Sequence, residues 1–74
     1  MKLRYDSSVD AAYITLLGDD DVPSFGSTYA CDPAEVKGQI HLDFDLDGRL
    51  IGIEVLQASK KLPMSMLRKC SSDS

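Results

Sequence analysis

The chain has 74 residues and a mass of 8.1 kDa, which is enough for one small domain and excludes a second. No stretch approaches the roughly 18 consecutive apolar residues of a membrane-spanning helix, and the N-terminal residues lack the apolar run of a signal peptide, so we expect a cytoplasmic protein that makes no membrane contact. Twelve acidic and eight basic residues give a net charge of -4, which disfavours binding to nucleic acid.

The small size also bears on assembly. A chain this short buries only about 60% of the surface of its unfolded state, so the monomer should be marginally stable and self-association would help it. We expect residues 1–69 to form a single compact domain and residues 70–74 to form a flexible C-terminal tail.

The two cysteines, Cys31 and Cys70, do not belong to a CxxC pair, so no structural zinc motif or redox motif is visible. In a cytoplasmic protein we expect two free thiols, with Cys31 half-buried and Cys70 in the tail. A disulfide between them stays open as the alternative.

The first half of the chain predicts three strands and a loop. Residues 2–5 alternate apolar and charged side chains before a turn, and residues 9–17 carry β-branched and aromatic side chains on both faces. Residues 18–23 contain three consecutive aspartates and a proline, which predict a solvated loop. Residues 24–31 form a weaker strand that includes a glycine, and we expect this strand at an edge of the sheet.

The second half predicts a helical turn followed by a β-hairpin. Asp32 in front of Pro33, with a glutamate two residues further on, is typical of a helix start. Residues 40–45 alternate apolar and polar side chains with a period of two, and residues 50–55 place Ile51, Ile53 and Val55 at every second position. The Asp-Gly dipeptide at residues 47–48 supplies a turn between them. These two segments are therefore expected to pair as antiparallel strands.

Matching of the apolar faces sets the expected register of this hairpin, because a slip of one residue would place an aspartate against an isoleucine. The expected pairs on the apolar face are Phe44 with Ile51, Leu42 with Ile53 and Ile40 with Val55. The expected pairs on the other face are Asp45 with Leu50, Asp43 with Gly52 and His41 with Glu54. The turn would be centred on Asp47 and Gly48, and a cross-strand pair of a histidine with a carboxylate is predicted.

After the hairpin, residues 59–62 and 63–69 are expected to form short helices. Their apolar side chains Leu62, Met66 and Leu67 could cover the sheet, although the flanking basic residues could instead contact a membrane surface or nucleic acid. We favour docking on the sheet. The expected fold is α+β, with a small antiparallel β-meander sheet of about five strands and a short C-terminal helical segment packed on one face.

The segment Asp43–Glu54, DFDLDGRLIGIE, satisfies the pattern of an EF-hand calcium loop. Calcium binding would require three aspartates to converge on one ion and the glutamate to reach back from a following helix. Both flanks alternate with the period of strands, which favours a hairpin instead. A cation-binding module that uses this acidic hairpin is the alternative function, and we expect no bound metal and no cofactor.

His41 is the only histidine, and together with Asp43 and Glu54 it forms a candidate surface cluster. It could act as a general base that one of these carboxylates orients. However, no nucleophile motif accompanies it, and carboxylates on an open sheet lack the pocket that shifts a pKa. We therefore expect no catalytic residue and no enzyme activity, and a hydrolase built around His41 is the least favoured hypothesis.

Four short motifs follow one another along the chain, namely YD at residues 5–6, DAAYI at residues 10–14, LDFDLDGRLIGIEVLQAS at residues 42–59 and LP at residues 62–63. Over about residues 2–67 the chain resembles a widespread bacterial family of small proteins, the domain-of-unknown-function family 2283. The resemblance implies an antiparallel meander with a C-terminal helical segment, and it implies no established activity, cofactor or substrate. Some members resemble antitoxin partners of small toxins in their genomic setting, which implies protein binding.

Apolar residues occur on both faces of the expected strands, and we take Tyr13, Leu50 and Leu56 as the candidate interaction surface. Because no active site is visible, the favoured function is a non-catalytic protein-interaction or self-associating module, with an antitoxin-like role as one form of it. The simplest assembly is a homodimer, and a small protein partner is the other possibility.

Overall fold

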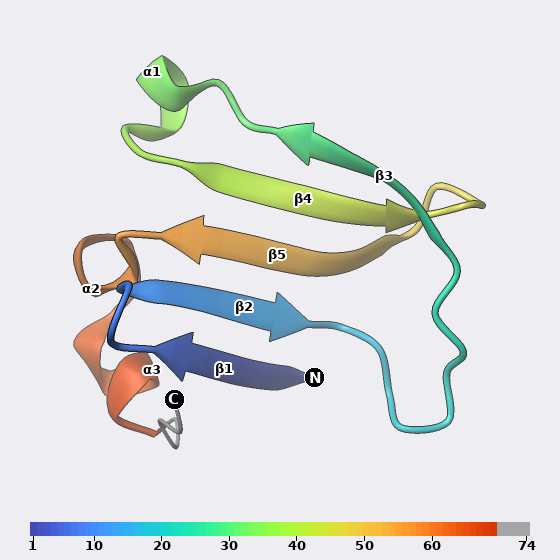
Figure 1. The fold of residues 1–74 in the computed structure, drawn as a ribbon, viewed down its shortest axis with the longest axis horizontal. Coiled ribbons are helices and arrows are strands. Elements are labelled where there is room, and N and C mark those ends of the chain that lie inside the picture. The colour runs from blue at the N-terminus through green and yellow to red at the C-terminus, as the bar shows by residue number, and fades with distance from the viewer. Residues whose placement is uncertain (70–74) are drawn as a thin grey trace.

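The computed structural model describes residues 1–69, which form one five-stranded antiparallel sheet with short helices (Figure 1). The strands are β1 (Lys2–Asp6), β2 (Ala11–Thr15), β3 (Phe25–Ala30), β4 (Ile40–Asp45) and β5 (Leu50–Leu56). The helices are α1 (Pro33–Val36), α2 (Ala58–Lys61) and α3 (Met64–Arg68). The predicted α+β class is confirmed. Cys31 is half-buried with a free thiol, as predicted, whereas Cys70 and the predicted tail at residues 70–74 lie outside the described residues.

The strand order is β1-β2-β5-β4-β3, which corrects the expected meander at one step. In a meander β2 would lie beside β3, whereas here β2 pairs with β5 and β3 forms the far edge. The connection at residues 16–24 runs past the tip of the β4–β5 hairpin (Figure 1). Three strand spacings amount to about 14 Å and a connection of this length reaches about 30 Å, so the crossing is unstrained. β5 holds buried Ile51 and Val55, and a central position gives these side chains neighbours on both sides.

The β4–β5 hairpin confirms the predicted register away from the turn and departs from it near the turn. The confirmed pairs are Ile40 with Val55, His41 with Glu54, Leu42 with Ile53 and Asp43 with Gly52. Phe44, however, pairs with Leu50 and not with Ile51, across a β-bulge. The predicted pair of Asp45 with Leu50 is also wrong, because the Asp45 amide donates to the Arg49 carbonyl at 2.9 Å.

This departure has a local cause in the turn. Residues 46–49 connect the two strands. Because Asp45 is hydrogen-bonded to Arg49, the loop itself consists of Leu46, Asp47 and Gly48, and Gly48 adopts a φ of +86°. The Gly48 amide donates to the Asp45 carbonyl at 3.0 Å, and the Asp45 carboxylate accepts the amides of Asp47 and Arg49 at 2.9 and 2.8 Å. A three-residue loop that ends in a left-handed glycine shifts the pairing by one residue, and the bulge absorbs this shift.

The predicted helical turn forms as α1 and is capped at both ends. The Asp32 carboxylate accepts the Ala34 amide at 2.9 Å, which confirms Asp32 as the N-cap. At the other end, the Lys61 ammonium group of α2 donates to the carbonyls of Val36 and Lys37 at 2.6 and 2.9 Å. Lys61 therefore ties α1 to the helical segment that covers the sheet.

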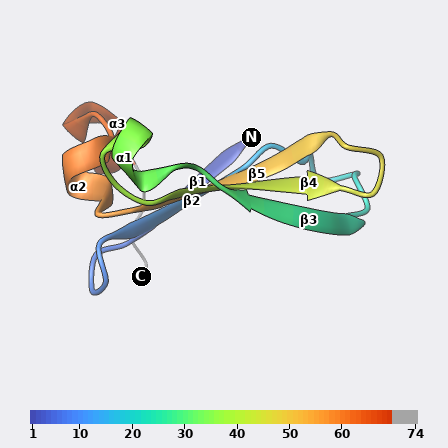
Figure 2. The same cartoon turned by 90° about the horizontal axis from the view of Figure 1, so that it is seen from above.

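Helices α2 and α3 cover one end of one face of the sheet, as the view from above shows (Figure 2). The core beneath them joins Ala12 of β2 and Val55 of β5 to Ala58 of α2 and Leu67 of α3. Leu62 packs against the same cluster, so the predicted docking of the C-terminal segment on the sheet is confirmed. None of the large apolar side chains in residues 1–69 is completely buried. The core is therefore small, which limits the stability of a single chain.

The far half of the sheet has no such cover. All six residues of β3 are exposed, and the residues of β4 are only partly buried. Phe25 and Tyr29 of β3 keep 57% and 58% of their surface accessible. The edge position predicted for residues 24–31 is confirmed, and β3 is the least buried of the described strands.

Candidate functional site

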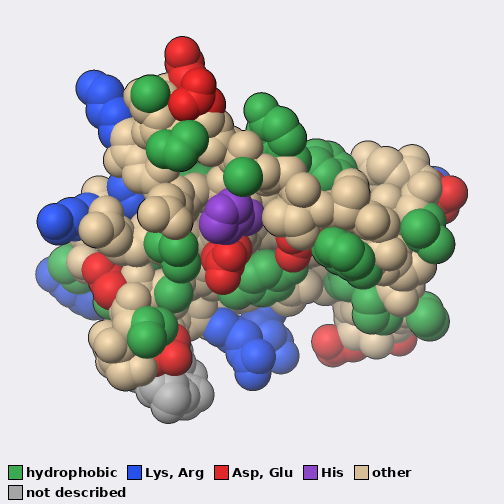
Figure 3. All heavy atoms as spheres, turned by 45° about the horizontal axis from the view of Figure 1, so that its top comes forward, with side chains coloured by type: hydrophobic (Ala, Val, Ile, Leu, Met, Phe, Trp, Pro, Cys, Tyr) green, Lys and Arg blue, Asp and Glu red, His purple; other side chains and the backbone are tan. Residues whose placement is uncertain are grey.

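The face of the sheet opposite the helices carries the polar candidates. Side chains alternate between the two faces of a strand, so Tyr13 and Glu54, which neighbour core residues of β2 and β5, point away from the core. His41 lies opposite Glu54 in the register, and Asp43 lies two residues further along β4. Figure 3 shows the histidine in purple among red carboxylates near the middle of this exposed surface.

His41 and Glu54 form the cross-strand pair that the register predicts. The histidine Nδ1 lies 2.9 Å from the Glu54 Oε1, and the two side chains are 28% and 45% exposed. Exposed pairs of this kind contribute little to stability, because water screens their attraction. The pair is therefore a surface feature and not a buried catalytic dyad.

A hydrogen-bonded chain crosses the sheet beside this pair. The Tyr13 hydroxyl of β2 donates to Asp43 of β4 at 2.7 Å, and the Thr28 hydroxyl of β3 donates to the other oxygen of the same carboxylate at 2.7 Å. The tyrosine reaches β4 by lying across Gly52 of β5, where a Cβ atom would overlap the Tyr13 hydroxyl. Burial, and then the bond to Asp43, raise the pKa of Tyr13 to about 12. These hydrogen bonds hold Tyr13 and Asp43 in place, but they activate neither of the two as a nucleophile.

The carboxylates of the calcium-loop pattern at Asp43–Glu54 do not converge. Its flanks are strands, as predicted. Asp43 accepts from two hydroxyl groups, Asp45 closes the hairpin loop, and Glu54 faces the histidine. Within residues 1–69, no three His, Cys, Asp or Glu side chains are grouped so that they could hold a metal ion. The geometry therefore gives no support to the cation-binding alternative.

A second polar cluster, which sequence reasoning missed, surrounds Asp10 in the turn between β1 and β2. Its carboxylate accepts the hydroxyl groups of Tyr5 and Ser59, both at 2.7 Å, and the Ser59 amide at 3.0 Å. Its carbonyl accepts the Ala58 amide at 2.9 Å. These bonds, that from the Ser59 hydroxyl above all, lower the pKa of the Asp10 carboxyl. Asp10 thereby caps the start of α2 from a distant part of the chain.

The contacts of Asp10 explain part of the sequence pattern. Tyr5, Asp10 and Ser59 all lie in the motifs that carry the family resemblance, and here they tie the β1–β2 turn to α2. The backbone of Asp10 has a φ of 54°, a left-handed conformation that few residues other than glycine, asparagine and aspartate adopt readily. These motif residues therefore stabilise the fold by joining the β1–β2 turn to α2.

The three residues of the candidate interaction surface lie at different positions along β2 and β5. Tyr13 is half-buried and its hydroxyl is bound to Asp43. Leu50, 37% exposed, begins β5 and Leu56 ends it, so about 20 Å of strand separates them. Leu56 lines a pocket of about 400 Å³ together with Val9, Pro33, Gly38, Gln39 and Gln57.

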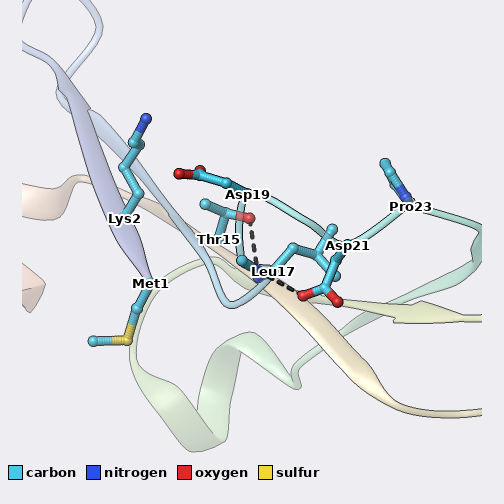
Figure 4. A pocket seen from close by; sticks show the side chains of 8 residues that line it. Met1, Lys2, Thr15, Leu17, Asp19, Asp21 and Pro23 are labelled. Carbon is cyan, nitrogen blue, oxygen red and sulfur yellow. Dashed lines mark hydrogen bonds between the residues drawn. The ribbon is translucent and has the colours of Figure 1, made fainter.

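A further pocket, of about 580 Å³, lies between the start of β1 and the loop after β2. Its lining residues are Met1, Lys2, Thr15, Leu17, Gly18, Asp19, Asp21 and Pro23. Figure 4 shows that the side chains point in different directions and do not meet at a common point. The Asp21 carboxylate accepts the Gly18 amide at 2.6 Å, so it serves to close the loop. This pocket therefore lacks the convergent polar groups of a small-molecule site.

These features define the class of protein, which is a small α+β domain built on an open antiparallel sheet with helices at one end of one face. The other face carries a polar strip, formed by Tyr13, Thr28, His41, Asp43 and Glu54. Residues 2–59 match the model of a family described as protein of unknown function (DUF2283), and the chain belongs to that family. Comparison with curated proteins and with solved structures gave no match. Among the described residues, no helix is long and apolar enough to span a membrane.

Proposed function

We propose that this protein is a non-catalytic protein-interaction module that associates with itself. The observation that carries the proposal is the uncovered half of the sheet, in which β3 and β4 contribute no buried residue. Exposed strands with large aromatic side chains gain stability when another chain covers them. The small core under the helices points the same way, because a chain with little buried apolar surface gains much from association.

The polar strip supports a non-catalytic role. Within the described residues, the polar contact of the His41 ring is with the Glu54 carboxylate, and not with a hydroxyl or thiol group that the histidine could deprotonate. Asp43 already accepts from Tyr13 and Thr28, so both of its oxygens have partners. Catalytic groups usually lie in a pocket that excludes water, and this strip lies on an open face. An antitoxin-like role, in which the bound protein is a small toxin, is a narrower form of the same proposal.

Sedimentation equilibrium of the wild-type chain tests the proposal over a concentration range from about 10 µM to about 1 mM, where interfaces of modest area associate. We expect an average mass that rises from 8.1 kDa towards twice that value. A mass that stays at the monomer value up to the highest concentration would contradict self-association.

A further inference from the structure

The exposed edge of β3 differs from the rest of the surface in its charge. This inference rests on the proposed self-association and names the surface involved. The strand has the sequence FGSTYA, without a charged residue, although the chain as a whole is acidic. All of its residues are exposed, and β4 is its only partner among the strands that residues 1–69 form. Natural proteins usually protect such an edge with charges, proline or a covering element, because an uncharged edge can accept another strand.

The register shows which backbone groups of this edge are available. The Cys31 amide donates to the Ile40 carbonyl at 2.9 Å, so this pair exchanges hydrogen bonds with β4. In an antiparallel ladder the bonded pairs alternate, and residues between them direct both backbone groups to the other side. With Tyr29 opposite Leu42, the amide and carbonyl groups of Thr28 and Ala30 therefore point outward from the sheet.

We infer that β3 pairs antiparallel with β3 of a second copy, around a two-fold axis at Tyr29. Thr28 of each chain then exchanges two backbone hydrogen bonds with Ala30 of the other. Tyr29 lies opposite its own counterpart in a non-hydrogen-bonded pair, the position where cross-strand side chains approach most closely. Two five-stranded sheets thereby join into one continuous sheet, and the two exposed edges are lost.

A second copy of this chain fits the β3 edge for two reasons. First, the side chains that would face each other around the tyrosines are small: Thr28 opposes Ala30, and Ser27 opposes Cys31. Second, charge repulsion is weak, although both copies are acidic. The Asp43 residues of the two copies lie three strand spacings apart and are offset by two residues along the strands, so about 16 Å separates them, which exceeds the Debye length of about 8 Å at physiological salt.

Features at both ends of β3 limit the length of the paired segment. At one end a β-bulge interrupts the strand between Phe25 and Ser27, and Gly26 approaches the backbone of Asp45 so closely that a Cβ atom would collide with it. At the other end, Pro33 starts α1 and removes an amide donor. The interface is therefore short, so we expect a dissociation constant of roughly 10 to 500 µM.

The first test compares Tyr29→Lys with Phe25→Lys by sedimentation equilibrium. Both side chains lie on β3 with nearly equal exposure, and both variants make the same change in charge. Only position 29 places two lysines against each other in the dimer, so Tyr29→Lys should weaken association about tenfold or more. Phe25→Lys, which lies beyond the bulge, should associate like the wild type. Ala30→Pro, which removes an outward amide without removing a bond to β4, should weaken association in the same way as Tyr29→Lys.

The second test is a disulfide crosslink in a background that carries Cys31→Ser and Cys70→Ser. Tyr29→Cys should form an intermolecular disulfide in air, because non-hydrogen-bonded pairs bring the Cβ atoms close to disulfide distance. Phe25→Cys should not, because the two copies of position 25 would lie about 27 Å apart along the ladder.

The outcomes separate this inference from the proposed function. Association that is equally strong in Tyr29→Lys and in the wild type, or a dimer without a crosslink at position 29, would overturn the β3 pairing and leave self-association standing. A wild-type chain that stays monomeric at about 1 mM would overturn both. Loss of association in Tyr29→Lys and Ala30→Pro, together with a crosslink at position 29 only, would establish the pairing.

Discussion

The two edges of the sheet hold equivalent places in the topology and are built in opposite ways. In β1, Lys2, Arg4 and Asp6 are exposed, and they alternate with Leu3 and Tyr5, which pack against the core. In β3 all residues are exposed and none is charged. The charges of β1 discourage a further strand, whereas β3 has no such protection.

The connections of the two edges differ as well. Tyr5 of β1 is tied through Asp10 to Ser59 of α2. Among the strands of residues 1–69, β3 pairs with β4 alone. The comparison teaches that contacts with the helical segment support the β1 edge, whereas within residues 1–69 the β3 edge lacks such contacts and is the one that we propose to bind a second chain. The predictions below test this contrast in order of expected size.

The largest difference should appear between Leu67→Ala and Tyr29→Ala. Leu67 of α3 is 7% exposed and belongs to the core, so its truncation should lower the free energy of unfolding by about 2–4 kcal/mol. Tyr29 is largely exposed, so Tyr29→Ala should cost no more than about 0.5 kcal/mol in the monomer. Urea unfolding at low micromolar concentration measures both values. Equal losses would show that the two edges are equally integrated into the fold.

The next largest effect is expected in the loop between β4 and β5. Gly48 has a φ of +86° and open space around its Cα, so Gly48→Val should destabilise the fold by about 1–2 kcal/mol through backbone strain alone. Gly18→Val is the matched control, since Gly18 also lies in an exposed loop but has no positive φ. Thermal unfolding of both variants checks the prediction, and an unchanged melting temperature for Gly48→Val would contradict the turn geometry.

The stabilisation that the Asp10 carboxylate provides at the β1 edge should decrease at low pH. The Asp10 carboxyl has a lowered pKa in the folded chain, from an ordinary value of 3.8. The carboxylate therefore contributes stability above that pH, and the contribution is lost as the pH falls through the lower folded value. Asp10→Asn should lower the melting temperature near neutral pH, and its difference from the wild type should shrink below pH 3.8. A difference that does not change with pH would show that the ionised carboxylate is not the stabilising form.

The smallest expected effect lies on the polar face. Tyr13→Phe removes one hydrogen bond to Asp43 and should cost about 0.5–1.5 kcal/mol near neutral pH. The pKa of Tyr13 is raised from 10.0 to about 12 in the folded chain. The hydrogen bond therefore contributes its full stability below pH 10, and this contribution is lost as the pH rises towards 12. The stability difference between wild type and variant should therefore fall over that interval. Spectroscopic titration of the tyrosines, with the variant as reference, measures the same pKa.

Local patterns predicted the local structure. The alternation around Leu42 and Ile53 was sufficient for the hairpin and for the His41–Glu54 pair. Asp32 in front of a proline correctly marked the start of α1. Each of these features depends on residues that are neighbours in the sequence or face each other across one short turn.

Features that depend on distant parts of the chain were not predictable in the same way. The strand order was missed because the loop after β2 is long enough to place β3 either beside β2 or at the far edge of the sheet. Which of the two arrangements forms depends on the burial of β5 between β2 and β4. The bond from Tyr13 to Asp43 requires strands β2, β5 and β4 to lie side by side with Gly52 in the middle. Gly52, flanked by two isoleucines, was the available signal, because a glycine inside a strand often marks a close approach of another group.

Amide hydrogen exchange at the two edges, followed by NMR at about 20 µM and at about 1 mM, tests the central contrast most directly. The amides of Thr28 and Ala30 point outward from β3, so they should exchange rapidly in the dilute sample and become protected in the concentrated one. The amides of β1 should exchange at the same rates in both samples. Exchange at Thr28 and Ala30 that stays rapid at both concentrations would contradict the account.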